Sequence, residues 1–346
     1  MKYLNKILAV ALAATMIGFT GCAGNDDEKE TTKGTTNTSE VTQAEDTDSK
    51  EMKVGIIQYL THASLDNCTQ GIINAIDGKV EYDVQIGSAG SADTDCESFA
   101  GNMVAKDYDA IIAVATPAAM KAYSAVINAS ADIPVIFCAV SDPIQAGLVE
   151  SLENPGVNCT GTCDAFDIEG QVKLIKTLQP DIKKLGVIYT TNEANSISQL
   201  KTLKEVAEEN GIEIVDQGIN EVSEIASASV SIVSKVDAIT NLTDNNVVDN
   251  MSVLLQQAKE ANIPVYGSEI EQVKLGCLAS ASLDYVALGE KTGNMALEIL
   301  DGKSAAETPV ITVVDSFEVL NEDVLSQLGL TLPDELKDIE KVNLSE

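Results

Sequence analysis

Two kinds of segment alternate along most of the chain: short β-branched runs, and longer stretches whose apolar residues recur every three or four positions. The runs predict buried strands and the stretches predict amphipathic helices. The first set has strands at 53–58, 80–86, 109–115 and 133–140, with helices at 64–77, 92–106 and 117–129. The second set has strands at 184–190, 212–217, 236–241 and 263–267, with helices at 195–210, 221–233 and 245–261. A helix at 286–300, a strand at 309–314 and a short helix at 321–328 follow. This alternation predicts an α/β protein with two doubly wound parallel-sheet lobes.

Three short fragments occur twice, in the same order and at nearly the same offset. The sequence KVGII begins at Lys53 and returns as KLGVI from Lys184; DAI at Asp109 returns at Asp237, and IPV at Ile133 returns at Ile263. Collinear repeats of this kind indicate two similar structural units. Two such lobes would face each other across a cleft, which is a common place for a small molecule to bind.

The loops after the strands are expected to line this cleft, because ligands of open α/β sheets bind at the carboxyl ends of strands. The repeat pairs these loops as 58–62 with 190–196, 116–117 with 243–245, and 139–142 with 267–269.

Two helix starts in these loops could bind an anion. Thr116 precedes Pro117 and Ala118, a hydroxyl–proline–small sequence typical of a helix N-cap whose free N–H groups face a carboxylate. In the other lobe, Asn195 or Ser196 could be the N-cap of a helix whose free N–H groups also face the cleft. A plain N-cap without a ligand is the alternative interpretation.

Acidic residues and one histidine are further candidates. Asp244, with Glu269 and Asp284 as weaker ones, could bind an ammonium group or a sugar hydroxyl, or could simply cap a helix. His62 is the only histidine of the chain, and it is either a ligand contact or a surface or capping residue. Tyr59 and Phe166 belong to a group of aromatic residues at strand ends, which either favour an apolar ligand side chain or cover the core.

The N-terminus predicts export. Residues 1–21 have the form of a signal peptide, and small residues before Cys22 resemble the lipobox of bacterial lipoproteins, in which that cysteine is acylated. Ordinary cleavage beside an incidental cysteine is the alternative. The polar segment 22–51 is expected to be a disordered tether, with the folded part beginning near Met52. The protein would then be extracytoplasmic and held at the cell membrane by lipidated Cys22.

Composition excludes several classes of function. The net charge is −32 and all 22 basic residues are lysines, so nucleic acid is not an expected partner. Without arginine, a ligand carboxylate must be held by lysine, hydroxyls or backbone N–H groups. No Walker, dinucleotide-binding, serine-hydrolase or metal motif occurs, so we expect neither an enzyme nor a cofactor or metal. Cys159 and Cys163 are spaced too far apart in an extended segment for a disulfide, and the cysteines after Cys22 are expected to be buried thiols.

Several motifs together resemble one known family. They are ATPAA from Ala115, FCAVSDP from Phe137, GLV from Gly147, NCTGT from Asn158, NEANS from Asn192, TDN from Thr243, and Asp284-Tyr285 with Leu288-Gly289. Across 53–305 the chain resembles substrate-binding lipoproteins of ABC transporters, of the tryptophan/tyrosine type. Cys138 stands where that group commonly has serine or threonine.

The resemblance implies a type I periplasmic-binding fold with a three-segment hinge, crossing near 162–166, 280–285 and 305–312. Lobe 1 would comprise 53–163 and 285–306, and lobe 2 would comprise 164–283 and 309–346. The ligand would be an amino acid, aromatic in character, delivered by a monomer to a membrane permease after hinge closure. The resemblance implies that Gln58, Thr116, Asn195, Ser196 and Asp244 bind it. From the loops and strand ends we further expect Tyr59, His62, Ala118, Asp142, Phe166, Glu269 and Asp284 as ligand-binding residues.

Other functions stay open on the sequence alone. The same fold could bind a nucleoside, a sugar or a branched-chain amino acid, or could serve as the ectodomain of a sensor. A hydrolase on this scaffold would need a pair of titratable groups in the cleft.

Overall fold

The computed structural model describes residues 52–314 and 316–344, which belong to one compact unit. The predicted signal peptide, the tether and Cys22 lie outside the described residues. Within the described part of the chain, no helix is long and apolar enough to cross a membrane.

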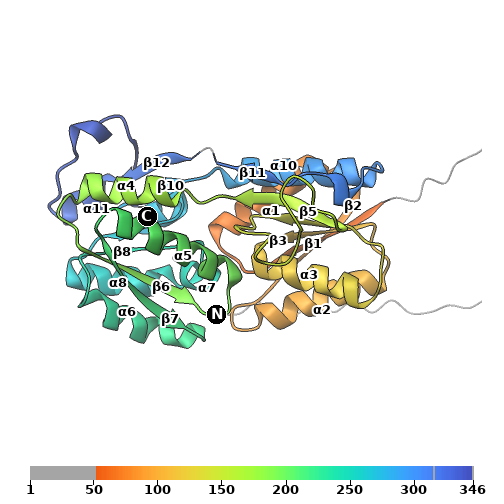
Figure 1. The fold of residues 1–346 in the computed structure, drawn as a ribbon, viewed down its shortest axis with the longest axis horizontal. Coiled ribbons are helices and arrows are strands. Elements are labelled where there is room, and N and C mark those ends of the chain that lie inside the picture. Colours follow the sequence, from red (N-terminus) through yellow and green to blue (C-terminus); the bar gives the residue numbers. More distant parts are fainter. Residues whose placement is uncertain (1–51, 315, 345–346) are drawn as a thin grey trace, which may run out of the picture. The chain divides into compact units, whose positions relative to one another are not determined.

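The first half of the fold is a parallel sheet of six strands in the order β11-β5-β4-β3-β1-β2. Its strands are β1 (Lys53–Gln58), β2 (Glu81–Ile86), β3 (Ala110–Val114), β4 (Val135–Cys138), β5 (Cys159–Asp164) and β11 (Ile311–Val313). Its helices are α1 (Ala63–Ile76), α2 (Ala92–Ala105), α3 (Thr116–Asn128) and α10 (Tyr285–Leu300). In Figure 1, α1 and α10 cover one face of this sheet, and α2 and α3 cover the other. Strands β1, β3 and β4 are buried almost throughout, which explains their continuous apolar runs.

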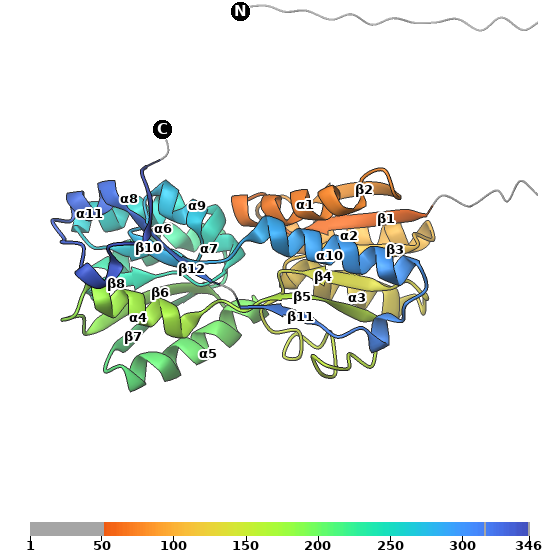
Figure 2. The ribbon, with the colours of Figure 1, turned by 90° about the horizontal axis from the view of Figure 1, so that it is seen from above.

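Helices α1 and α10 lie side by side in both views (Figures 1 and 2), and glycines allow their close approach. A Cβ atom on Gly289 would lie 2.1 Å from the carbonyl oxygen of Cys68, and one on Gly71 would lie 2.1 Å from the carbonyl oxygen of Val286. Because real Cβ atoms do not approach an oxygen so closely, only glycine fits at either position. This contact holds α10 against the first half of the fold.

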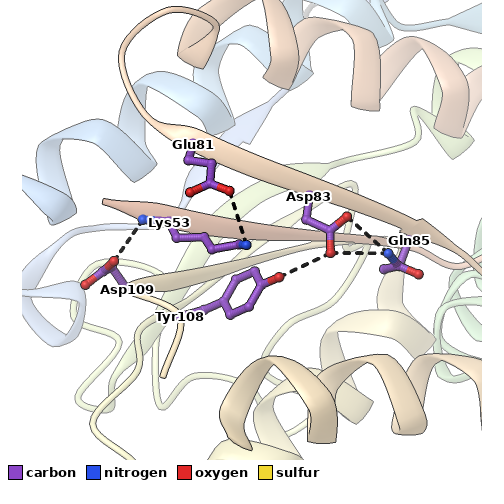
Figure 3. Close-up of polar contacts among 6 residues, drawn as sticks. All are labelled: Lys53, Glu81, Asp83, Gln85, Tyr108 and Asp109. Atoms are coloured by element: carbon purple, nitrogen blue, oxygen red, sulfur yellow. Dashed lines mark hydrogen bonds and ion pairs between the residues drawn. The ribbon is translucent and has the colours of Figure 1, made fainter. Parts of the chain in front are cut away.

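A polar cluster joins the amino ends of the first strands (Figure 3). The Lys53 ammonium lies 3.2 Å from a carboxylate oxygen of Glu81 and 5.0 Å from the centre of the Tyr108 ring, while the backbone N–H of Lys53 donates to Asp109. The Tyr108 hydroxyl donates to Asp83 at 3.2 Å. The half-exposed ion pair adds little free energy, so we assign this cluster to strand alignment, at the end of the sheet away from the loops that follow the strands.

The second half of the fold contains a parallel sheet of four strands in the order β7-β6-β8-β9. Its strands are β6 (Lys184–Thr190), β7 (Glu213–Ile219), β8 (Ala238–Thr240) and β9 (Val265–Tyr266). Its helices are α4 (Ile168–Leu178), α5 (Ala194–Glu209), α6 (Ile225–Val233), α7 (Asn245–Asp249), α8 (Met251–Ala261) and α9 (Ile270–Leu275), with the 3-10 helix η1 (Val222–Glu224) before α6. Helices α4 and α5 pack on one face, and α6 and α8 pack on the other.

A separate three-stranded sheet completes this half. It consists of β10 (Ala279–Ser282), β12 (Phe317–Asn321) and β13 (Glu340–Val342), with β10 and β12 antiparallel. Helix α11 (Glu322–Gln327) and the 3-10 helix η3 (Asp334–Leu336) follow β12, and the 3-10 helix η2 (Ala305–Glu307) follows α10. The sequence pattern did not predict this sheet, because its strands are short and pair across a long sequence separation.

Two further details differ from the sequence prediction. The helix expected over 245–261 is two helices, because Asn250 has φ −109° and ψ 22°, outside the helical range, and interrupts the run. The strand expected at 309–314 was grouped with the second lobe, but β11 pairs with β5 of the first sheet. Val310 packs in the core of that first sheet, which explains this pairing.

Candidate functional site

A cavity lies where the loops after the strands of the two halves meet. The space between atoms there is about 380 Å³, including the part of the mouth that is open to solvent. From the first half it is lined by His62, Ser64, Leu65, Ala115, Thr116, Ala139 and Ser141. From the second half it is lined by Asn195, Thr243, Asn245, Val248, Ser268, Glu269 and Gln272. Asp164, at the end of β5, and Tyr285, at the start of α10, complete the wall.

Unpartnered polar atoms concentrate on this wall. Among the described residues, four buried side-chain polar atoms have no hydrogen-bond partner, and three of them belong to His62 (Nδ1), Thr116 (Oγ1) and Asn195 (Oδ1). Buried polar groups in native proteins are nearly always hydrogen-bonded, so each exception needs an explanation. Three exceptions around one cavity indicate a site for a polar ligand.

Thr116 does not have the capping role that the sequence suggested. Helix α3 begins at Thr116 itself, and its N-cap is Ala115, whose φ of 82° is strained for a residue with a Cβ atom. The Thr116 hydroxyl is therefore left unpartnered at the first turn of a helix of 13 residues. Ala118 is completely buried in the same helix and does not line the cavity.

Two carboxyl groups lie on the cavity wall. Asp164 accepts a hydrogen bond from the Ser141 hydroxyl at 3.1 Å and one from the Tyr285 hydroxyl at 3.4 Å, and burial raises its pKa to about 6. Glu269 caps α9 by accepting from the backbone N–H groups of Glu271 and Gln272, and burial raises its pKa to about 7. Glu269 is therefore the cap of α9, and its side chain also lines the cavity.

The described wall carries these acids without any lysine, so it favours a ligand with a cationic or hydrogen-donating group.

Asp244 is buried behind the wall rather than on it. Its oxygens accept from the Thr190 backbone N–H at 2.6 Å, the Thr190 hydroxyl, the Ser196 hydroxyl and the Val247 backbone N–H. The expected contact with a ligand ammonium is therefore not supported by the geometry, since Asp244 is fully buried and all these donors already surround it. The alternative interpretation, a cap for the following helix, describes its position.

The predicted capping of α5 by Asn195 or Ser196 also differs from the structure. This helix begins at Ala194 with Glu193 at its N-cap, so both residues lie in its first turn. Ser196 points to Asp244 and Asn195 reaches the cavity.

The remaining predicted residues lie away from this cavity. Gln58 is buried and satisfied within its own half by Leu60, Asp66 and Thr69. Tyr59 lines a second hollow, together with Asn192 and Asn246.

Phe166 packs against the core of the second half, and exposed Asp284 caps α10 by accepting from the Ala287 N–H. Neither reaches the cavity wall. Their predicted roles rested on sequence position at strand ends, which does not give the direction of a side chain.

Direct hydrogen bonds join the two sides of the cavity. His62 Nε2 lies 3.3 Å from Asn245 Oδ1, and Ser141 Oγ lies 3.3 Å from Thr243 Oγ1. Asp142, another predicted ligand contact, instead accepts from the Ser198 hydroxyl at 2.9 Å and caps the turn at Gln145. The two halves are therefore in contact around the cavity.

Sequence reasoning missed several wall residues. Asp164 ends a strand that was not among the predicted strands. Ser64, Val248 and Gln272 lie among the first four residues of α1, α7 and α9, just beyond the loops that the sequence selected. The internal repeat had already paired the loop 243–245 with 116–117, so it could have identified Thr243 and Asn245 as wall residues.

The cysteines and acids offer no metal site in the described chain. No group of histidine, cysteine, aspartate and glutamate residues there could hold a metal ion. The six cysteines within the described ranges are all buried and form no disulfide.

Comparison with known proteins agrees with this architecture. The family model for ABC transporter substrate binding proteins matches residues 53–341. A tyrosine-binding protein of Clostridioides difficile (strain R20291) is 38% identical over 335 residues, which cover 95% of this chain and 92% of that protein.

Solved structures show the same fold, a type I periplasmic-binding fold. An ABC domain from Streptococcus pneumonia in complex with L-Trp is 33% identical, with a TM-score of 0.80 over 84% of this chain and 99% of that chain. The ligand-free, open structure of a substrate binding protein with adhesive properties from Clostridium difficile is 36% identical, with a TM-score of 0.63 over 85% of this chain and 100% of that chain. The chain therefore belongs to the family of ABC transporter substrate-binding proteins.

Proposed function

We propose that this protein is an extracytoplasmic binding lipoprotein of an ABC importer, and that its ligand is an aromatic amino acid such as tyrosine or tryptophan. The carrying observation is the cavity between the two halves, whose wall combines three unpartnered polar atoms with two carboxyl groups. The names of two relatives, one tyrosine-binding and one in complex with L-Trp, support the ligand class.

The chemistry of the wall suits a zwitterion. Asp164 and Glu269 would favour the ammonium group, since a buried carboxylate is stabilised by an opposite charge nearby. The carboxylate would be held by the Thr116 hydroxyl and the N-terminus of α3, because the wall has neither arginine nor lysine.

Hinge closure would then couple binding to transport. A ligand that touches both halves stabilises the closed form by its differential affinity for that form, and the permease would recognise the closed form. The higher TM-score against the L-Trp complex than against the open, ligand-free structure supports a closed arrangement in this chain.

Ligand binding can be measured by fluorescence, because the chain contains no tryptophan. Excitation that spares tyrosine would report only added L-tryptophan, and we expect its emission to become polarised on binding and to be released by excess L-tyrosine. A thermal-shift assay should show stabilisation by about 2.7 kcal/mol at a hundredfold excess of ligand over its Kd. If neither amino acid nor L-phenylalanine binds, the proposed ligand class is wrong and the family membership is untouched.

Membrane attachment is proposed through Cys22, which follows small residues at the end of the signal-like segment. In cells, Cys22→Ala is expected to move the protein from the membrane fraction to the soluble exported fraction, because two or more acyl chains supply the stable attachment. Detection of the wild-type N-terminal peptide without any lipid by mass spectrometry would contradict this assignment.

A further inference from the structure

Glu193 was not among the predicted site residues, yet it accepts hydrogen bonds from side chains that line the cavity. Glu193 is 1% exposed, and its two carboxyl oxygens accept five N–H hydrogen bonds. Burial and the neighbouring Asp244 raise its pKa to about 8, while the hydrogen bonds from Asn245 and Asn195 favour the ionised form. Three come from the side-chain amides of Asn195, Asn245 and Asn246, at 3.1, 2.7 and 3.0 Å. The other two come from the backbone N–H groups of Asn245 and Asn246. One buried carboxylate therefore fixes which end of each amide faces it.

These orientations determine the tautomer of His62. Since Asn245 donates its Nδ2 group to Glu193, its Oδ1 atom is the end that faces His62 Nε2 at 3.3 Å. An amide oxygen only accepts, so Nε2 must carry the proton. Burial lowers the pKa of His62 to about 4, so the ring is neutral at pH 7 and Nδ1 is a bare acceptor.

The same carboxylate orients Asn195. Its Nδ2 group donates to Glu193 and, at 2.8 Å, to the backbone carbonyl of Thr243. Its Oδ1 atom is then left without a partner among the described residues, like His62 Nδ1. Both residues line the cavity, and they come from opposite halves of the fold.

We propose that Glu193 is a positioning residue for ligand recognition, which presents His62 Nδ1 and Asn195 Oδ1 to the cavity as acceptors for the ammonium group of the ligand. The two acceptors select a group with several N–H donors and reject a carboxylate at the same place, because an acceptor facing an acceptor leaves both unpaired. This inference rests on the proposed function for the identity of the ligand. The tautomer of His62 does not depend on which ligand binds.

The tautomer can be read directly by NMR, since His62 is the only histidine. In the ligand-free protein labelled with 15N-histidine, we expect one neutral ring with a proton on Nε2 alone. In Glu193→Gln, the new NH₂ group cannot accept from the amides around it, and the form with the proton on Nδ1 should appear. An Nδ1–H tautomer in the wild type would overturn the proposal without any ligand being added.

Ligand binding provides a second test of the proposal. L-tyrosine is expected to bind the wild type at least a hundredfold more tightly than 3-(4-hydroxyphenyl)propionate, which lacks the amino group. Glu193→Gln should bind L-tyrosine at least tenfold more weakly. The ratio between its affinities for L-tyrosine and for the propionate should also be smaller than in the wild type. Glu213→Gln, on the exposed edge of β7, is the matched control and should behave as the wild type.

The remaining outcomes are decisive as well. An unchanged tautomer in Glu193→Gln, or an altered tautomer with unchanged affinity, would overturn the positioning role. If Glu193→Gln does not fold, Asn245→Ala removes the acceptor of His62 Nε2 and is expected to mix the tautomers in the same way. If no amino acid binds while the wild-type tautomer is as expected, the proposed function fails and the arrangement of His62 stands.

Discussion

Replacing Gly289 with alanine is expected to destabilise the protein by about 3 kcal/mol or more, a large part of the stability of a typical domain. The new Cβ atom would lie 2.1 Å from the carbonyl oxygen of Cys68, and backbone on the facing helix cannot rotate away as a side chain can. Helices α1 and α10 would have to separate, which would open the core of the first half. Urea denaturation followed by circular dichroism would measure the loss.

Gly101→Ala is the matched control for this substitution. Gly101 is exposed in α2, and a Cβ atom there would have nothing within 4 Å. Because alanine favours a helix over glycine, this variant should be neutral or more stable by up to about 1 kcal/mol. Equal stability of Gly289→Ala and Gly101→Ala would show that α1 and α10 do not pack as closely as described.

Replacing Asp164 with asparagine should change stability and binding in opposite directions. The pKa of Asp164 is raised from 3.8 to about 6 because burial disfavours the charged form. A carboxyl group with a raised pKa in the folded state contributes stability that is present below pH 4 and is lost as the pH rises through about 6. At pH 8, Asp164→Asn is therefore expected to be more stable than the wild type, by on the order of 2 kcal/mol.

The affinity for the ligand should fall when Asp164 is replaced with asparagine. Ionised Asp164 would pair with the ligand ammonium, so the affinity of the wild type for L-tyrosine should rise as the pH increases from 5 to 7. Removing one partner of a buried charge pair costs about 2–5 kcal/mol, so Asp164→Asn should weaken binding at pH 8 by about thirtyfold or more.

Denaturation and calorimetry at pH 5 and pH 8 would measure both effects. A variant that is less stable at pH 8, or that binds as the wild type does, would remove Asp164 from the proposed site.

The regular elements were largely predictable because each carries its own local signal. The strands of the internal repeat and the helices between them lie within a few residues of their predicted bounds, since buried parallel strands are continuous apolar runs. The three-stranded sheet was not predictable in this way. Its strand β12 contains Glu318 and Asn321 and is stabilised by pairing with β10, which no local pattern encodes.

The site was only partly predictable from the sequence. The rule for carboxyl ends of strands selected the loops that carry His62, Thr116, Asn195 and Glu269, and the structure places these four on one cavity wall. The rule could not say which residue of a loop faces inward. Asp244, Ser196 and Gln58 belong to the same loops or strand ends but turn toward buried partners, because a completed hydrogen-bond network there competes with solvent or ligand.

A crystal structure of the protein with L-tyrosine would test the central claim most directly. We predict that the amino acid lies in the cavity between the two halves, with its ammonium nitrogen about 2.7–3.2 Å from Asn195 Oδ1 and His62 Nδ1. The carboxylate should face Thr116 and the first turn of α3. An amino acid bound outside this cavity, or bound inside it with its carboxylate against His62 and Asn195, would contradict the account.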